Sequence, residues 1–234
     1  MEDEGELHIA ELAERHPEWV VTSPRHQAIW ESAWQLEPPQ PLRDLYVLTE
    51  HPQGAVPGEY EPCTGDAYVL AAPPRSLTGV EPGIASLQTL LHEIAHAFIE
   101  PRRVVDLDDY WDEEAAVDDA AVRLADELGV PEVFQGDWLA RERVKNAEAR
   151  KATKRLAAFL DPNEGRDVVD DFLELRERLA GLARASGVPM AGGHLDWVAL
   201  NTLLDRAESD AGLREKITAL TDPMMRPDYD AANR

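Results

Sequence analysis

Residues 89–100 read TLLHEIAHAFIE, and inside them HEIAH sets two histidines four positions apart. Residues i and i+4 of an α-helix lie on the same face, so His92 and His96 can reach one metal ion. Glu93 lies about 100° further round the helix axis. In the HExxH pattern, a glutamate at this position accepts a proton from a water on the metal. The apolar flanks of this segment predict a core helix with one polar stripe, and burying that stripe is costly unless an ion such as zinc satisfies it.

The segment has a simpler interpretation, in which HExxH occurs by chance and both histidines are ordinary core or surface residues. Its position in the middle of an apolar helical pattern favours the metal. A metal site then needs a third ligand, because catalytic zinc usually has three protein ligands and one position left for water.

Two kinds of residue are candidates for the third ligand. Glu114 lies on the next predicted helix, and Asp118 follows on the same helical face, where it can reach the N–H of a liganding imidazole. Glu113 is adjacent to Glu114 and can replace it, but a shift of one residue turns the side chain by about 100°, so only one of the two can face the site. His194, in GGHLDW, is the alternative and would complete a three-histidine site.

Periodicity and turn signals predict α+β order, with helices, then a small sheet, then helices. Two strands are expected at 42–49 and 66–72, with a Gly/Pro-rich loop between them. Besides the HEIAH helix, which follows the loop after the second strand, helices are predicted at 5–16, 23–36, 112–129, 137–160, 164–185, 194–209 and 210–221. The segment 102–111 is expected to be a loop. The predicted domains are a metal-binding domain over 1–135, packed helices over 136–222 and a tail over 223–234.

The helices at 137–160 and 164–185 are predicted to form an antiparallel hairpin across DPNEG. Apolar residues at three- and four-residue spacings, Val144 among them, are expected to be buried between the two arms. The basic residues would then lie on an outer side.

The net charge of the 234-residue chain is −23, from 46 acidic and 23 basic residues. This charge disfavours broad contact with nucleic acid or anionic lipid. No apolar run approaches the ~20 residues of a membrane span, and the acidic start MEDEGELHIAELAERH differs from a secretory signal. We expect a soluble, cytoplasmic protein without membrane contact. The single cysteine, Cys63, excludes an intramolecular disulfide.

Residues 141–155 depart from this charge balance, with seven basic and two acidic residues. One interpretation is a solvated helix face that pairs with acidic helices of the same chain. The other is a contact with nucleic acid or an acidic protein.

Taken together, LLHEIAHAF and the following Glu-x-x-x-Asp helix resemble the zincin metallopeptidases of gluzincin type, especially the small ImmA/IrrE-like proteins. The resemblance implies a zincin-like core in which His92, His96 and Glu114 bind Zn²⁺ and Glu93 is the general base. It also implies that the strand 66–72 lines the substrate cleft and that His194 donates to the oxyanion. SprT-like metallopeptidases are the rival resemblance, because His194 is followed by an aromatic residue three positions on; there His194 would be the third ligand and the enzyme would be associated with DNA.

The function expected from these residues is that of a zinc metallopeptidase, in which a metal-bound water attacks a peptide or protein substrate and Glu93 moves the proton. The alternative from another class is a zincin-shaped binding or regulatory module without turnover. The sequence leaves the substrate and the oligomeric state open.

Overall fold

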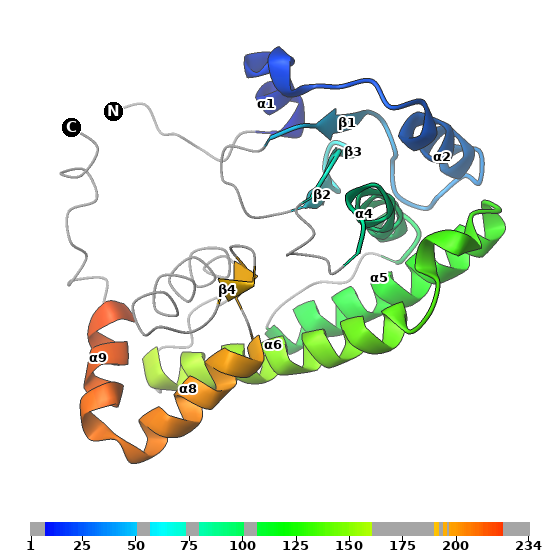
Figure 1. Cartoon of the computed structure of the whole chain (residues 1–234). Coiled ribbons are helices and arrows are strands. Elements are labelled where there is room, and N and C mark those ends of the chain that lie inside the picture. The colour runs from blue at the N-terminus through cyan, green and yellow to red at the C-terminus, as the bar shows by residue number, and fades with distance from the viewer. Residues whose placement is uncertain are drawn as a thin grey trace. The chain divides into compact units, whose positions relative to one another are not determined.

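The computed structural model describes residues 8–50, 57–73, 80–100, 107–160, 190–191, 194–195 and 197–221. Helices and a small three-stranded sheet make a mixed α+β fold, which confirms the predicted class (Figure 1). The chain forms two compact units: unit 1 comprises 1–102 and 113–142, and unit 2 comprises 103–112 and 143–234. In the described part of the chain, no helix combines the length and the apolar character needed to cross a bilayer.

The sheet of unit 1 has the strand order β1-β3-β2. Strand β1 (Leu45–Leu48) pairs in parallel with β3 (Asp66–Leu70), and β2 (Gly58–Glu61) pairs with β3 in antiparallel fashion. The two predicted strands are confirmed, but the prediction of a loop throughout the segment between them was wrong. The sequence GEYE has little intrinsic strand preference, and it becomes a strand because β3 supplies partners for its backbone groups.

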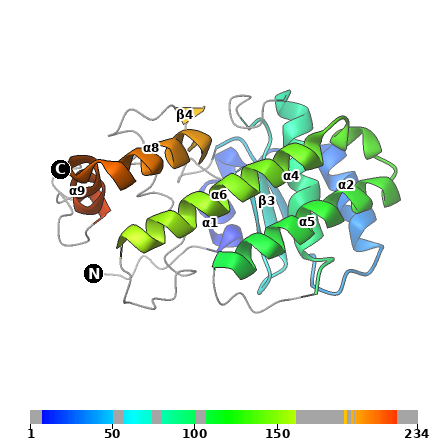
Figure 2. The same ribbon diagram turned by 90° about the horizontal axis from the view of Figure 1, so that it is seen from below.

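The α-helices of unit 1 follow the predicted pattern with shifts at their ends, whereas its two 3₁₀ turns were not predicted. They are α1 (Ile9–Arg15), the 3₁₀ turn η1 (Pro17–Trp19), α2 (Pro24–Trp34), α4 (Pro82–His96), most of α5 (Leu107–Glu127) and the 3₁₀ turn η2 (Pro131–Phe134). Helix α5 starts five residues before the predicted 112, so the expected loop at 102–111 was wrong for its last part. In Figure 2, β3 and α4 lie next to each other within this unit.

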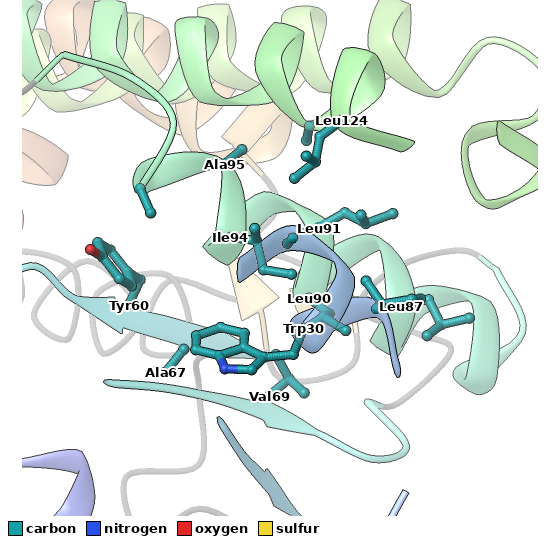
Figure 3. Packing of buried hydrophobic residues seen from close by; sticks show 14 of the residues in the cluster. Trp30, Tyr60, Ala67, Val69, Leu87, Leu90, Leu91, Ile94, Ala95 and Leu124 are labelled. Carbon is teal, nitrogen blue, oxygen red and sulfur yellow. The ribbon is translucent and has the colours of Figure 1, made fainter. Parts of the chain in front are cut away.

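Helix α4 runs through the core of unit 1. Leu90, Leu91 and Ile94 are fully buried. Trp30 of α2 and Val69 of β3 belong to the same cluster, as does Leu124 of α5 (Figure 3). Full burial of a large apolar side chain contributes about 1.5–3 kcal/mol, so packing on several faces fixes both the position and the rotation of α4. The polar residues of HEIAH are thereby held in a set direction.

Unit 2 contains most of α6 (Trp138–Leu160), the strands β4 (Met190–Ala191) and β5 (His194–Leu195), and the helices α8 (Trp197–Ser209) and α9 (Ala211–Thr221). The three helices were predicted, although α8 starts at 197 because 194–195 is a strand. The predicted helix at 164–185, and with it the hairpin, lies outside the described residues. Val144 is 64% exposed, which contradicts its predicted burial.

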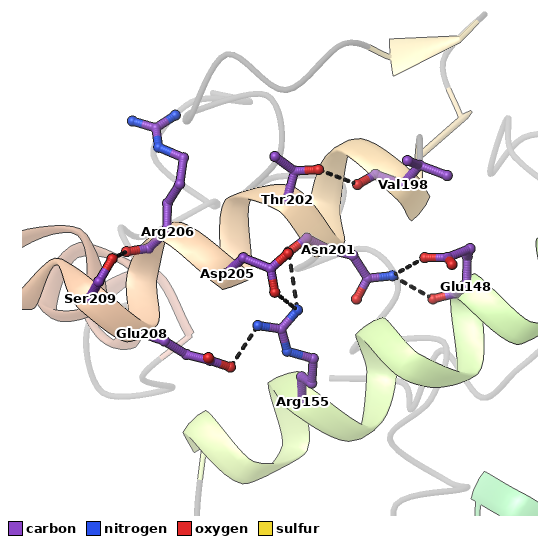
Figure 4. Close-up of polar contacts among 9 residues, drawn as sticks. All are labelled: Glu148, Arg155, Val198, Asn201, Thr202, Asp205, Arg206, Glu208 and Ser209. Atoms are coloured by element: carbon purple, nitrogen blue, oxygen red, sulfur yellow. Dashed lines mark hydrogen bonds and ion pairs between the residues drawn. The ribbon is translucent and has the colours of Figure 1, made fainter.

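The basic stretch 141–155 has carboxylate partners inside unit 2. Arg150 contacts Asp108 and Asp112, and Lys154 also contacts Asp108. Arg155 lies between Asp205 and Glu208 of α8, at 2.8 and 2.6 Å, as Figure 4 shows. Such ion pairs are expected if the basic stretch is a solvated helix face that pairs with acidic helices of the same chain.

Candidate metal centre

The end of α4 is held by the segment that follows α2. The Gln40 side chain donates from Nε2 to the carbonyls of His96, at 2.7 Å, and Ile99, at 3.2 Å. The backbone N–H of Gln40 donates to the carbonyl of Ala97 at 3.1 Å. Carbonyls in the last turn of a helix lack partners within the helix. Gln40 satisfies three carbonyls at and just after the end of α4 and so fixes the turn that carries His96.

Glu114 faces the outer nitrogens of both predicted histidine ligands. Its Oε2 lies 3.4 Å from His92 Nε2, and its Oε1 lies 3.9 Å from His96 Nε2. One ligand atom from each of the three residues lies within 4.8 Å of the other two. Ligand atoms around a tetrahedral zinc are about 3.3 Å apart for bonds of ~2.0–2.1 Å. Small adjustments would therefore bring the three residues around one cation.

Asp118 holds the other side of the His92 ring. Its Oδ1 accepts a hydrogen bond from His92 Nδ1 at 3.0 Å, and the Asp118 side chain is almost fully buried. A proton on Nδ1 leaves Nε2 as the nitrogen available to a metal. This is the contact that the helical spacing of Glu114 and Asp118 predicted.

Glu113 reaches a different nitrogen from Glu114. Its Oε1 lies 3.9 Å from His96 Nδ1, whereas Glu114 faces Nε2 of the same ring. Of the two adjacent glutamates, Glu114 is the one that approaches both histidines from the side on which they can share an ion. The backbone of His194 lies in β5 of unit 2 and its side chain lies outside the description, so its predicted roles stay predictions.

Glu93 is buried against strand β2. A Cβ added to Gly58 would lie 3.1 Å from Glu93 Cγ and 2.5 Å from Thr89 Cγ2, so only glycine lets the strand approach α4 this closely. The pKa of Glu93 is raised to about 8, chiefly by burial. The charge on His92 opposes this rise, and the carboxylates of Glu114 and Glu59 contribute to it.

The two histidines have opposite protonation preferences without an ion. Burial and then the neighbouring charge on His92 lower the pKa of His96 to about 4, against the opposing effect of the Glu114 and Asp118 carboxylates. Burial also acts to lower the pKa of His92, but the hydrogen-bonded carboxylates of Asp118 and Glu114 outweigh burial and raise it well above 6.5. His96 is therefore ready to coordinate, whereas His92 must exchange its Nε2 proton for the metal.

The side chain of Tyr60 in β2 lies beside His96. The two rings are stacked, with centroids 6.2 Å apart and an interplanar angle of 12°. The Tyr60 hydroxyl donates to the carbonyl of Pro41 at 2.8 Å, and burial raises the pKa of this phenol to about 12. The sequence reasoning missed Tyr60 because it placed residue 60 in a loop, and it missed Gln40 because that residue lies among prolines.

The donor set fits a divalent cation. Two imidazoles and the carboxylates of Glu93, Glu114 and Asp118 gather in a partly to fully buried space, and buried carboxylates require a positive partner or a proton. Imidazole and carboxylate are a ligand set that zinc commonly takes. Comparisons of the chain with known protein families, with curated proteins and with solved structures give no match. A function therefore has to be inferred from the site itself.

Proposed function

We propose that the protein is a zinc-dependent peptidase with a zincin-like core. The observation that carries the proposal is the convergence of His92, His96 and Glu114 on one point, with Glu93 beside them and Asp118 behind His92. The sequence resemblance to gluzincins rests on the same residues, so the geometry and the resemblance support one assignment.

His92, His96 and Glu114 would hold the zinc. When bound there, zinc supplies a Lewis acid that activates water and polarises a carbonyl group. The stack of Tyr60 on His96 and the hydrogen bond from His92 to Asp118 keep both imidazole rings oriented for this role.

Glu93 is the residue that moves the proton. It follows His92 directly, is buried and has a pKa of about 8 when no cation is present. A cation at the three ligands would bring this pKa down, because an opposite charge favours the carboxylate. A general base works best with a pKa near the working pH, so Glu93 can take a proton from water and return it to a leaving amine.

An extended peptide is the substrate class that suits the strand next to the site. Strand β3 pairs on both sides, whereas β2 pairs only with β3 among the described strands. The outer edge of β2 can therefore accept the backbone of an extended peptide. The role of lining the substrate cleft, which the resemblance implied for 66–72, fits β2 better.

The test compares Glu93→Gln with Glu113→Gln. Each variant is assayed for zinc by elemental analysis and for turnover by mass spectrometry of a mixed peptide library. We expect wild-type protein and Glu113→Gln to cleave peptides and to carry about one zinc per chain more than a His92→Ala/His96→Ala variant, and Glu93→Gln to keep that zinc while losing at least ~10²-fold in rate. Zinc-loaded wild-type protein that cleaves nothing would instead support a binding or regulatory module.

A further inference from the structure

Unit 1 holds a second group of metal-binding side chains, which shares no residue with the candidate metal centre. His8 precedes α1, Glu61 ends β2, and Cys63 lies in the turn between β2 and β3. His8 Nδ1 lies 2.9 Å from Glu61 Oε1. One ligand atom from each of the three residues, the sulfur of Cys63 included, lies within 4.8 Å of the other two.

The turn that carries Glu61 and Cys63 has a fixed backbone. The N–H of Gly65 donates to the carbonyl of Glu61 at 2.8 Å, and Gly65 has a φ of +82°, which favours glycine. A Cβ at Gly65 would also lie 2.8 Å from the carbonyl oxygen of Pro41. The turn therefore presents its glutamate and its cysteine two positions apart in a set geometry.

The carboxylate of Glu61 is oriented before any ion binds. The hydroxyl of Thr64 donates to Glu61 Oε2 at 2.8 Å and accepts the backbone N–H of Asp66 at 3.1 Å. This leaves Glu61 Oε1 directed at His8. Hydrogen bonds that fix one oxygen of a carboxylate in this way are typical of the groups that support metal ligands.

We propose that His8, Glu61 and Cys63 form a second zinc site, which ties the start of α1 to the β2–β3 turn. An imidazole nitrogen, a carboxylate oxygen and a sulfur are all zinc ligands, whereas Mg²⁺ and Ca²⁺ take oxygen ligands. His8 and Cys63 are exposed, so both side chains can turn towards an ion without disturbing the core. The site leaves one position of a tetrahedral ion for water.

A titration with Co²⁺ tests this site. Cobalt replaces zinc as a visible probe, and a Co²⁺–thiolate bond gives a charge-transfer band in the near ultraviolet. Cys63 is the only cysteine of the chain, so the band reports this site alone, whether or not the candidate metal centre is loaded. We expect the band in full-length wild-type protein and in a His92→Ala/His96→Ala variant, which keeps the test independent of the proposed function.

Variants of the ligands identify the other two partners. Cys63→Ala should abolish the band and remove one equivalent of bound metal, while His8→Ala and Glu61→Gln should each weaken Co²⁺ binding at least ~10-fold. His16→Ala is the matched control, because His16 pairs with Glu18 at 3.2 Å and stacks on Trp19, away from any thiol ligand. The absence of a thiolate band in wild-type protein would overturn the site, as would a band of unchanged affinity in both His8→Ala and Glu61→Gln.

Discussion

At the scale of single residues, each carboxylate of the candidate metal centre has a different neighbour. Glu114 faces the Nε2 atoms of both histidines, Asp118 holds His92 Nδ1, and Glu113 lies near His96 Nδ1. Glu93 is buried next to β2. Four acidic side chains of similar chemistry are therefore separated into distinct roles by the rotation of two helices.

The contrast between the adjacent glutamates can be measured. Glu114→Ala should weaken zinc binding by at least ~100-fold, because it removes a ligand, whereas Glu113→Ala should change it by less than ~10-fold. Competition with a chromophoric chelator at pH 7.5 gives both values. Equal losses in the two variants would contradict the assignment of Glu114, and a loss in Glu113→Ala alone would transfer the role to Glu113.

The residues that the sequence could predict share a helix with their partners. His92, Glu93 and His96 are related by helical periodicity, and so are Glu114 and Asp118. Tyr60 and Gln40 reach the centre only through tertiary structure, since neither lies on a helix or within a periodic pattern that relates it to His96. Residues of this kind need the positions of distant segments, which one sequence does not supply.

At the scale of elements, strand β2 is the element that could not be predicted from the sequence. Its four residues lie in a stretch rich in glycine and proline, and the alternation over GEYE is too short to separate a strand from a loop. Packing accounts for two residues of this strand: Gly58 allows β2 to contact α4, and the Tyr60 ring stacks on His96. The composition that favours a loop is therefore also what lets this strand lie beside the site.

Gly58→Ala tests the close approach of β2 to α4. The new methyl group would meet Thr89 Cγ2 at 2.5 Å, the Tyr68 carbonyl oxygen at 3.0 Å and Glu93 Cγ at 3.1 Å. We expect a loss of about 1–3 kcal/mol in the free energy of unfolding, as for overpacked sites. Gly83→Ala is the control, because a Cβ at Gly83 meets nothing within 4 Å. Urea denaturation of both variants gives the comparison, and equal stabilities would contradict the packing of β2 on α4.

A buried histidine joins three elements of unit 1. His26 of α2 contacts Ser23 Oγ through Nδ1 at 2.6 Å and Ser86 Oγ of α4 through Nε2 at 2.7 Å. The Ser86 hydroxyl donates to the carbonyl of Leu70 in β3 at 2.6 Å. Ser86 must then accept from His26 Nε2. In the neutral ring, Nδ1 accepts a hydrogen bond from the Ser23 hydroxyl.

This chain of hydrogen bonds predicts a pH dependence of stability. Burial, and to a smaller extent Arg25, lowers the pKa of His26 below 6.5. Below pH 6.5 the unfolded chain therefore binds more protons at His26 than the folded chain does. The contribution of His26 to the free energy of unfolding is complete above that pH and decreases as the pH falls towards the pKa of His26 in the folded protein. Urea midpoints between pH 7.5 and 5 should decline less steeply in His26→Gln than in wild-type protein. Parallel declines would show that His26 does not titrate in this way.

At the scale of the whole molecule, the class of the fold could be predicted from the sequence, but the contacts between distant segments could not. The α+β class and the helices at both ends of the described chain followed from periodicity and cap signals. Residues 103–112 belong to unit 2 with most of α6, and Asp108 of this segment pairs with Arg150, 42 positions further along the chain. Ion pairs between distant residues leave no periodic pattern in a sequence. The sequence therefore predicted a loop at 102–111, and it could indicate that the basic helix pairs with acidic helices of the same chain without identifying Asp108 as a partner.

Ion pairs join the segment 103–112 to α6, in a chain with a net charge of −23. Arg150 and Lys154 both contact Asp108, and the Arg150 and Lys154 side chains are 34% and 50% exposed. Exposed pairs contribute only about 0.2–1 kcal/mol each and are screened by salt. These pairs of the basic stretch therefore stabilise unit 2 only modestly.

Charge reversal separates this internal role from a binding role. The double variant Arg150→Glu/Lys154→Glu places two acidic groups against Asp108 and Asp112, and we expect its melting temperature to fall by several degrees in low salt. Lys151→Glu is the control on the same helix, since Lys151 is exposed and its reversal adds the same kind of charge without facing that pair. Because salt screens exposed charges, the gap between the two variants should narrow in ~0.5 M NaCl. If the double variant loses only about twice as much stability as Lys151→Glu, in proportion to its change in net charge, net charge rather than these contacts governs the effect. If neither variant loses stability, while wild-type protein alone binds an acidic partner at low salt, the stretch is a docking surface.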